Sequence, residues 1–283
     1  MRMLAAPYQL KSRAAAFDRF ESRGRLVAVF FGDAVGFAPI HGPGSYDQLQ
    51  VMLRYARIDA LARARGESLR REVPQSHTLL GVLADSAHWP EGKCVKIKIG
   101  RHWATECKLL ERACSRYERL RLDANSLFTQ DTFMDLWRIL EPFAPKIDFI
   151  EDPVPYHPEN WRAIEQLGVR LAYDGLSPPS SIGYSVQVIK PALGHFKPLW
   201  PGKTYVVTSY ADSFYGEQMA IYDAAYYKQM YPELIFEMPG MSAQQIWDED
   251  TSSSEPGFGA WPVLSGLFEE FSYGDSASSS HAG

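Results

Sequence analysis

Two lysines stand two positions apart in the segment KCVKIKIG, residues 93–100. Lys96 and Lys98 alternate there with β-branched residues, and an alternation of period two predicts a β-strand. Side chains two positions apart on a strand point to the same face, so both ammonium groups lie together. Lysines that protect an edge strand from aggregation are one interpretation of this pattern. Lysines that take part in proton transfer are the other.

Four later segments each end an apolar run in a charged residue that is followed by a turn. They read RLRLDAN, IDFIEDP, RLAYDG and VQVIKP, and the charged residues are Asp123, Glu151, Asp174 and Lys190. One acid alone is explained by a helix N-cap or a loop charge, and Asp152 by the start of a turn. Three acids that end successive parallel strands meet at one mouth, where they repel each other unless a cation lies between them. Ligands that are all oxygen favour a hard cation, Mg²⁺ before Zn²⁺.

These acids give the lysines a chemical role. An apolar pocket and a nearby divalent cation both disfavour the ammonium form, so we expect a lysine pKa lowered toward the range of a general base. Lys96 and Lys98 on one side of the mouth, and Lys190 on the other, would flank a substrate held by the metal. This arrangement suits the removal of a proton next to a carboxylate, because nearby cations stabilise the negative charge that develops. We therefore interpret the lysines as catalytic.

The elements that must position these residues alternate regularly from about residue 76. Eight strands are predicted, at His77–Leu83, Cys94–Ile99, Leu120–Asp123, Asp148–Glu151, Arg170–Asp174, Val186–Lys190, Tyr205–Ser209 and Leu234–Glu237. Clear helices are predicted at 103–120, 129–143, 158–168 and 216–231. The alternation predicts an α/β fold with a parallel barrel, since the G-x-G-x-x-G fingerprint of an open doubly wound sheet is missing. The segments 175–184 and 191–203 are too short and too rich in Pro and Gly for full helices, which predicts a barrel trimmed on one side.

The region before the barrel has a different pattern. Two strands flank a turn at Gly32-Asp33, and an apolar helical pattern follows Ser45, a residue suited to an N-cap. We therefore expect a small α+β capping domain over residues 1–75 and a barrel domain over residues 76–271. The Ser-, Gly- and Ala-rich segment 272–283 is expected to be a flexible tail.

The composition is that of an ordinary globular protein. The 283 residues are 46% hydrophobic and 22% charged, and the net charge of −5 gives no basic surface for nucleic acid or an anionic membrane. Three cysteines without metal-ligand spacing indicate reduced thiols. No targeting segment and no apolar run of membrane-spanning length is evident, so we expect a cytoplasmic protein without a membrane partner. The oligomeric state is not decided, and a monomer is compatible with the sequence.

The combined motifs resemble those of the enolase superfamily, in particular its muconate-lactonising subgroup. The segments VKIKIG, LRLDAN, FIEDP, VIKP and VVTSYADSFYG are similar to strand ends of the o-succinylbenzoate synthase family. The segment GFAPIHGPGS is similar to that family's active-site loop, although HGPGS could equally form a tight turn before the helix. The resemblance covers residues 36–266 and implies a (β/α)7β-like modified TIM barrel with an N-terminal capping domain.

The resemblance also implies roles for individual residues. Lys98 would be the base and Lys96 its supporting neighbour, while Lys190 would stabilise an enediolate. The ligands of Mg²⁺, with Mn²⁺ as an alternative ion, would be Asp123, Glu151 and Asp174. A small carboxylate substrate would contact Ser209, Tyr210, Gly240 and His41.

The implied reaction is the dehydration of 2-succinyl-6-hydroxy-2,4-cyclohexadiene-1-carboxylate to o-succinylbenzoate, a step of menaquinone biosynthesis. An N-succinylamino acid racemase or a dipeptide epimerase of the same superfamily is the alternative, and a metal-binding homologue without turnover is another. Gly175 follows Asp174 where relatives often carry an acid, which favours the last. The missing arginine in IKPALG disfavours the racemase, and the missing D-x-D after LIFEMPG disfavours the epimerase. His195 is interpreted as a polar loop residue.

Overall fold

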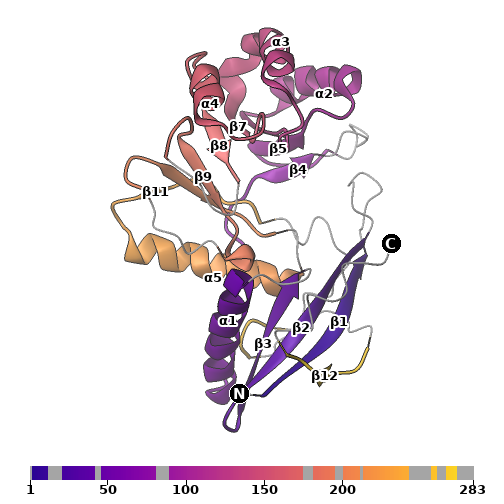
Figure 1. Ribbon diagram of the computed structural model, residues 1–283, viewed down its shortest axis with the longest axis vertical. Helices are drawn as coiled ribbons and strands as arrows, with labels where there is room; N and C mark the ends of the chain where they lie inside the picture. Colours follow the sequence, from indigo (N-terminus) through magenta and orange to yellow (C-terminus); the bar gives the residue numbers. More distant parts are fainter. Residues whose placement is uncertain are drawn as a thin grey trace.

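A computed structural model of the chain describes residues 2–11, 21–41, 46–80, 89–174, 181–194, 200–210, 213–241, 256–259 and 266–272. The chain forms a parallel sheet with its helices and a smaller antiparallel sheet, with helix α5 lying between the two parts (Figure 1). Gly175 and His195 lie outside the described residues, as do residues 42–45, 247–250 and 273–283 and the side chain of His41. Within the described part of the chain, no helix is long and apolar enough to cross a membrane.

The antiparallel sheet has the strand order β12-β1-β2-β3. Its strands are β1 (Arg2–Lys11), β2 (Glu21–Phe31), β3 (Ala34–His41) and β12 (Glu269–Glu270). The predicted hairpin is confirmed, because β2 and β3 pair in register around Gly32, whose φ of +65° suits glycine. The sequence did not predict β1. Nor did it place β12, which pairs with β1 although it belongs to the range assigned to the barrel.

Helix α1 (Tyr46–Ala64) packs on β3 and β2. The two backbones approach most closely at Gly36, where an added Cβ atom would lie 1.8 Å from the carbonyl oxygen of Ala56. Only glycine permits this contact. Phe258 packs into the same apolar cluster, so the cap's core also uses residues from the far end of the chain. The division of the chain at residues 75 and 271 stays a prediction.

The parallel sheet has eight strands in the order β11-β10-β9-β8-β7-β6-β5-β4, and all eight predicted strands are confirmed. They are β4 (Thr78–Leu80), β5 (Cys94–Lys98), β6 (Arg119–Asp123), β7 (Ile147–Glu151), β8 (Leu171–Tyr173), β9 (Val186–Ile189), β10 (Thr204–Val207) and β11 (Ile235–Phe236). The sheet curls so that apolar side chains from neighbouring strands fill its inside, and these are Phe149, Ala172, Val186, Val188 and Val206. This is the expected barrel.

The helices cover the outside of the curled sheet (Figure 1). They are α2 (Trp103–Arg116), α3 (Gln130–Leu140), α4 (Pro158–Glu165) and α5 (Phe214–Met230), with the short 3-10 helices η2 (Glu141–Lys146) and η3 (Pro191–Leu193). Between β9 and β10 the described residues form only the single turn η3, and none of those between β8 and β9 is helical. The predicted trimming therefore falls on this side.

A buried ionic contact joins the cap to the barrel. On α1, Arg54 donates two hydrogen bonds of 2.7 and 3.0 Å to the carboxylate of Asp223 on α5. The hydroxyl of Tyr55 donates a third, of 2.6 Å, to the same carboxylate. Burial raises the pKa of Asp223 even though Arg54 opposes the change. The Arg54–Asp223 pair therefore adds little net stability, but removal of one charge would leave the other without a counter-charge.

We predict that Asp223→Asn destabilises the protein by about 3 kcal/mol, because the amide leaves Arg54 without a counter-charge in a buried contact. Urea unfolding followed by circular dichroism measures this. Asp135→Asn is the matched control, since Asp135 pairs with Arg138 on the exposed surface and should change stability little. Equal effects of the two substitutions would contradict a structural role for the α1–α5 contact.

Candidate active site

The strand register brings the predicted charged residues to one edge of the parallel sheet. Lys98 on β5 lies opposite Asp123 on β6, and Asp123 lies opposite Glu151 on β7. Glu151 is paired with Ala172 on β8, and Asp174 follows two residues later on the same face. Lys190 comes directly after β9. The carboxyl ends of the parallel strands thus form the mouth of the barrel, where such folds carry their chemistry.

Lys96 is bonded to two of the predicted metal ligands. Its Nζ lies 2.7 and 2.8 Å from the two carboxylate oxygens of Glu151 and 2.9 Å from Oδ2 of Asp123. The side chains of Asp123 and Glu151 are only 4% and 2% exposed. The two carboxylates therefore share one buried cation, which is the charge balance that the sequence required.

Lys190 serves the third acid in the same way. Its Nζ donates a hydrogen bond to Oδ2 of Asp174 and lies 5.9 Å from the centre of the Tyr210 ring. The other oxygen of Asp174, Oδ1, is buried and has no hydrogen-bond partner among the described residues. A buried carboxylate oxygen without a donor is costly, so this atom calls for a cation or donor that the described side chains do not provide.

The expected lowering of the lysine pKa is not found among the protein groups alone. Burial acts in that direction on Lys96 and Lys190, but the carboxylates around them outweigh it and raise the pKa of both lysines. The sequence argument counted the desolvation and overlooked how directly the acids would pair with the ammonium groups. A divalent cation among the acids would take up part of this negative charge.

The acids themselves respond differently. Burial and the neighbouring Asp123 raise the pKa of Glu151 well above its ordinary value, although Lys96 opposes this. Burial also acts to raise the pKa of Asp123, but Lys96 outweighs it and the pKa is lowered. The carboxylates of Asp123 and Glu151 therefore repel each other even with Lys96 between them.

Asp152 does more than begin a turn. Its φ is +43°, which is uncommon for a residue with a side chain, and its Oδ1 accepts a 3.1 Å hydrogen bond from the backbone N–H of Asp174. Burial, with the charge of Asp174 next, raises the pKa of Asp152 to about 7. Asp152 therefore connects the ends of β7 and β8 directly behind two of the predicted ligands. Its signal in the sequence was only its place beside Glu151.

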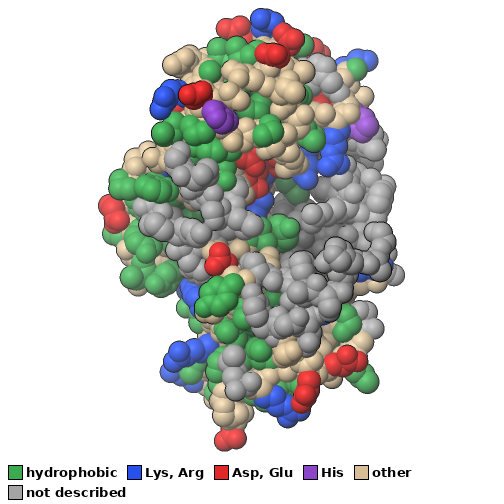
Figure 2. Space-filling model, in the orientation of Figure 1, with side chains coloured by type: hydrophobic (Ala, Val, Ile, Leu, Met, Phe, Trp, Pro, Cys, Tyr) green, Lys and Arg blue, Asp and Glu red, His purple; other side chains and the backbone are tan. Residues whose placement is uncertain are grey.

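Three of the four predicted substrate-binding residues, Ser209, Tyr210 and Gly240, lie beyond the carboxyl end of β10, at the same end of the barrel. The backbone N–H of Ser209 donates a 2.9 Å hydrogen bond to the carbonyl oxygen of Gly240, and Tyr210 follows with its ring near Lys190. The side chain of Lys98 is exposed, and its charge acts on Asp123. His41 ends β3 in the cap. Figure 2 shows acidic and basic side chains next to each other at a hollow in the middle of one face.

Two buried residues beneath the mouth were not singled out by the sequence analysis. Arg121 precedes Asp123 by two positions on β6, and the ring of His77 lies 2.9 Å from its Nη1. Both side chains are almost fully buried. The alternation of RLRLD places Arg121 on the face of Asp123, and this was the available signal.

The acids fit a hard divalent cation in their chemistry. They are all oxygen donors, their carboxylates lie close together and repel each other, and Asp174 Oδ1 has no donor among the described residues. As the side chains are placed, no three of the described acids, histidines or cysteines converge on one point, because the ammonium of Lys96 lies between Asp123 and Glu151. Binding of Mg²⁺ would therefore need rearrangement of the Lys96 side chain.

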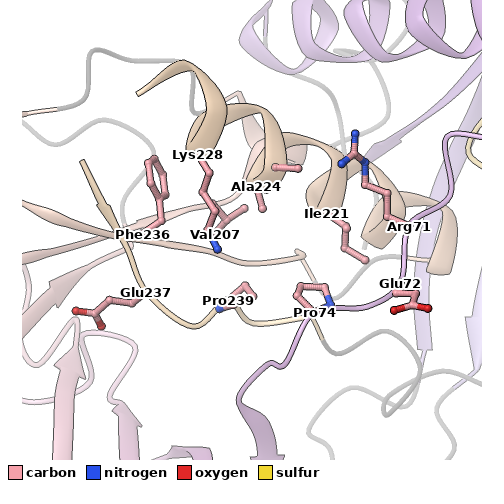
Figure 3. A pocket seen from close by; sticks show the side chains of 11 residues that line it. Arg71, Glu72, Pro74, Val207, Ile221, Ala224, Lys228, Phe236, Glu237 and Pro239 are labelled. Carbon is pink, nitrogen blue, oxygen red and sulfur yellow. The ribbon is translucent and has the colours of Figure 1, made fainter. Parts of the chain in front are cut away.

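A separate cavity lies outside the barrel, between α5 and the strands β10 and β11 (Figure 3). Its volume is about 500 Å³, and the apolar side chains that line it include Val207, Ile221 and Phe236. The charged residues Glu237 and Lys228 line it as well. None of the predicted site residues lines it, so the candidate site is the mouth of the barrel.

The chain is similar to known proteins in sequence and in fold. No family model matches the chain. The o-succinylbenzoate synthase of Bdellovibrio bacteriovorus is 27% identical to it, and the similarity covers 88% of each chain.

Solved structures share the fold at lower identity. Muconate lactonizing enzyme from Pseudomonas putida has a TM-score of 0.69 at 12% identity, covering 91% of this chain and 95% of its own. The L-Ala-D/L-Glu epimerase from Bacillus subtilis has a TM-score of 0.68 at 14% identity, covering 94% of this chain and 98% of its own. The o-succinylbenzoate synthase from Thermosynechococcus elongatus, which holds Mg in its active site, has a TM-score of 0.58 at 17% identity. The match covers 88% of this chain and 95% of its own. The resemblance to the enolase superfamily is confirmed, and the chain has that superfamily's capped barrel fold.

We predict that Glu151→Gln lowers Mg²⁺ affinity by on the order of 100-fold, because loss of even an outer partner of a metal ligand costs about 10- to 100-fold. The fold should survive, since the amide keeps the shape and relieves repulsion from Asp123. Titration calorimetry with Mg²⁺, beside a thermal melt, measures both effects. Glu118→Gln is the control, because Glu118 pairs with Lys93 on the surface. Unchanged Mg²⁺ binding in Glu151→Gln would exclude this residue as a ligand.

Proposed function

We propose that the protein belongs to the enolase superfamily and is a hydro-lyase of the o-succinylbenzoate synthase type. Its reaction is the dehydration of 2-succinyl-6-hydroxy-2,4-cyclohexadiene-1-carboxylate to o-succinylbenzoate, as in menaquinone biosynthesis. One observation carries the proposal. Lysines from β5 and from the end of β9 stand on opposite sides of the three acids on β6, β7 and β8.

Lys98 is proposed as the base. It lies beside Asp123 at the end of β5, and its side chain is exposed at the mouth, where a substrate can reach it. In its neutral form, Nζ takes the proton from the carbon next to the substrate carboxylate, and the electrons of that C–H bond form an enediolate. The same Nζ then returns the proton to the departing hydroxyl, so that water leaves and the lysine is neutral again.

The other residues stabilise charge and orient the substrate. Lys96 balances the charge of Asp123 and Glu151 beside the base, and its ammonium would move aside when these acids hold Mg²⁺. Lys190, on the opposite side, supplies a cation for the enediolate. Mg²⁺ held by Asp123, Glu151 and Asp174 would supply further positive charge toward the substrate carboxylate. Ser209, Tyr210, Gly240 and His41 are proposed to contact the substrate.

Racemisation or epimerisation is the second candidate, and the same lysines favour it. An epimerase needs one base on each face, because the proton leaves from one side and returns on the other. Lys98 and Lys190 could meet that need. The relative of 27% identity is a synthase, which supports dehydration as the first choice.

We predict that Lys98→Arg lowers kcat for dehydration by about 10²- to 10⁴-fold, because a guanidinium keeps the charge but cannot act as a base. Lys190→Arg should also lower kcat, through poorer stabilisation of the enediolate. The assay follows formation of the aromatic product by absorbance with Mg²⁺ present. Lys93→Arg, at the exposed start of the same segment, is the control and should keep full activity.

Hydrogen exchange separates the two candidates. An N-succinylamino acid is incubated with the enzyme in deuterated water, and its α-hydrogen is followed by NMR for each enantiomer. A synthase should turn over the cyclohexadiene much faster than it interconverts the enantiomers. Fast exchange and interconversion of both enantiomers, with poor turnover of the cyclohexadiene, would show that Lys98 and Lys190 are opposed bases.

A further inference from the structure

We propose that Arg121 and His77 are positioning residues that hold segment 238–240 in place beneath the mouth and so set the position of Gly240 and Ser209. The assignment of Gly240 and Ser209 to a substrate pocket rests on the proposed function. The contacts that hold segment 238–240 are independent of that proposal.

Arg121 is a fully buried arginine that reaches across the inside of the barrel. From β6, its Nη1 donates a 2.7 Å hydrogen bond to the carbonyl oxygen of Met238, in the segment that follows β11. Its Nε donates a 2.8 Å hydrogen bond to Asp148, and its guanidinium lies 4.7 Å from the centre of the Phe149 ring. A planar guanidinium can make both hydrogen bonds and stack on the ring at the same time, whereas an ammonium cannot.

His77 holds the next two residues of the segment. Its backbone N–H donates a 3.1 Å hydrogen bond to the carbonyl oxygen of Pro239. Its ring lies beside Arg121 and so close to Gly240 that an added Cβ atom there would be 2.4 Å from Cε1. Burial, with the charges of Arg121 and Lys96, keeps the pKa of His77 well below its ordinary value. The ring is therefore neutral, and Nδ1 can accept a hydrogen bond from Arg121.

These contacts lie where the sheet has its two ends. β4 and β11 are the first and last strands in the order of the described sheet, and His77 directly precedes β4. Met238 and Pro239 follow β11 closely. Arg121 and His77 therefore join the two ends of the sheet from the inside.

The effect reaches the mouth through the backbone. Gly240 donates a hydrogen bond of 3.0 Å to the carbonyl oxygen of Val207 and accepts one of 2.9 Å from Ser209. Tyr210 follows Ser209 and places its ring near Lys190. A shift of segment 238–240 would thus move the side of the mouth that carries Ser209, Tyr210 and Lys190. The ends of β6 and β7 would stay in place, because they are hydrogen-bonded to each other.

A double-mutant cycle between Gly240 and His77 tests this contact. Gly240 is not among the glycines with positive φ, so alanine is opposed there by its neighbours and not by the backbone. Gly240→Ala should lower kcat/KM by about 10- to 100-fold, mainly through KM, because a misplacement of about 1 Å can cost that much. Adding His77→Ala removes the ring and should restore part of the loss. The Thr208 methyl, which would lie 2.9 Å from the new Cβ, limits the rescue.

Arginine variants give the second arm. Arg121→Lys should raise KM and speed amide exchange at His77, Gly240 and Ser209, measured by hydrogen–deuterium exchange. Mg²⁺ binding and exchange at Ala124, which bonds to Glu151, should stay unchanged. Arg170→Lys is the matched control, since Arg170 binds Asp148 and Glu237 in the same ionic layer. It should alter stability and leave KM unchanged.

The two arms give distinct outcomes. No rescue of Gly240→Ala by His77→Ala, or equal effects of Arg121→Lys and Arg170→Lys on KM and on exchange, would overturn the proposal. If the wild type does not turn over the cyclohexadiene, the proposed function fails. The exchange measurements then decide alone whether Arg121 and His77 hold segment 238–240.

Discussion

The crowding of negative charge at the mouth of the barrel is the constraint on which the rest of the structure depends. Asp123 and Glu151 end two adjacent strands and are almost fully buried, and Asp174, which is partly buried, directly follows the next strand. Three carboxylates so placed are stable only with cations among them, because water cannot screen them. Lys96 and Lys190 supply part of this charge from strands on either side. Deeper in the barrel, the carboxylate of Asp148 is likewise paired with a cation, the guanidinium of Arg121.

Much of the fold could be predicted because its signals are local. Each barrel strand is a short apolar run, four of the runs end in a charge and a turn, and every run formed a strand. The side of the barrel without full helices was visible as Pro- and Gly-rich intervals too short to hold them. Lys96 and Lys98 could be placed on one face from a period of two residues alone. The same alternation brought Asp123 beside Lys98 in the register.

The parts that could not be predicted depend on contacts between distant residues. β12 is two residues long, and only its pairing with β1 identifies it as a strand. The partner of Lys96 could not be read from the strand that carries it, because the distance to Glu151 is set by the curl of the sheet. For the same reason the sequence did not show that the acids, acting without a metal ion, raise the pKa of Lys96 and Lys190. Asp152 looked like an ordinary turn residue, since its bond to the backbone of Asp174 spans 22 positions.

The pairing of β12 with β1 has a consequence for the order in which the molecule can form. A chain leaves the ribosome from its N-terminus, and domains tend to fold as they emerge. Here β1, β2, β3 and α1 emerge first, but the strand beside β1 and the ring of Phe258 come more than 190 residues after the end of α1. Until then β1 has an open edge, and the core of the cap lacks the aromatic side chains of Phe258 and Phe271. The cap is therefore started first and completed last, with the whole barrel synthesised in between.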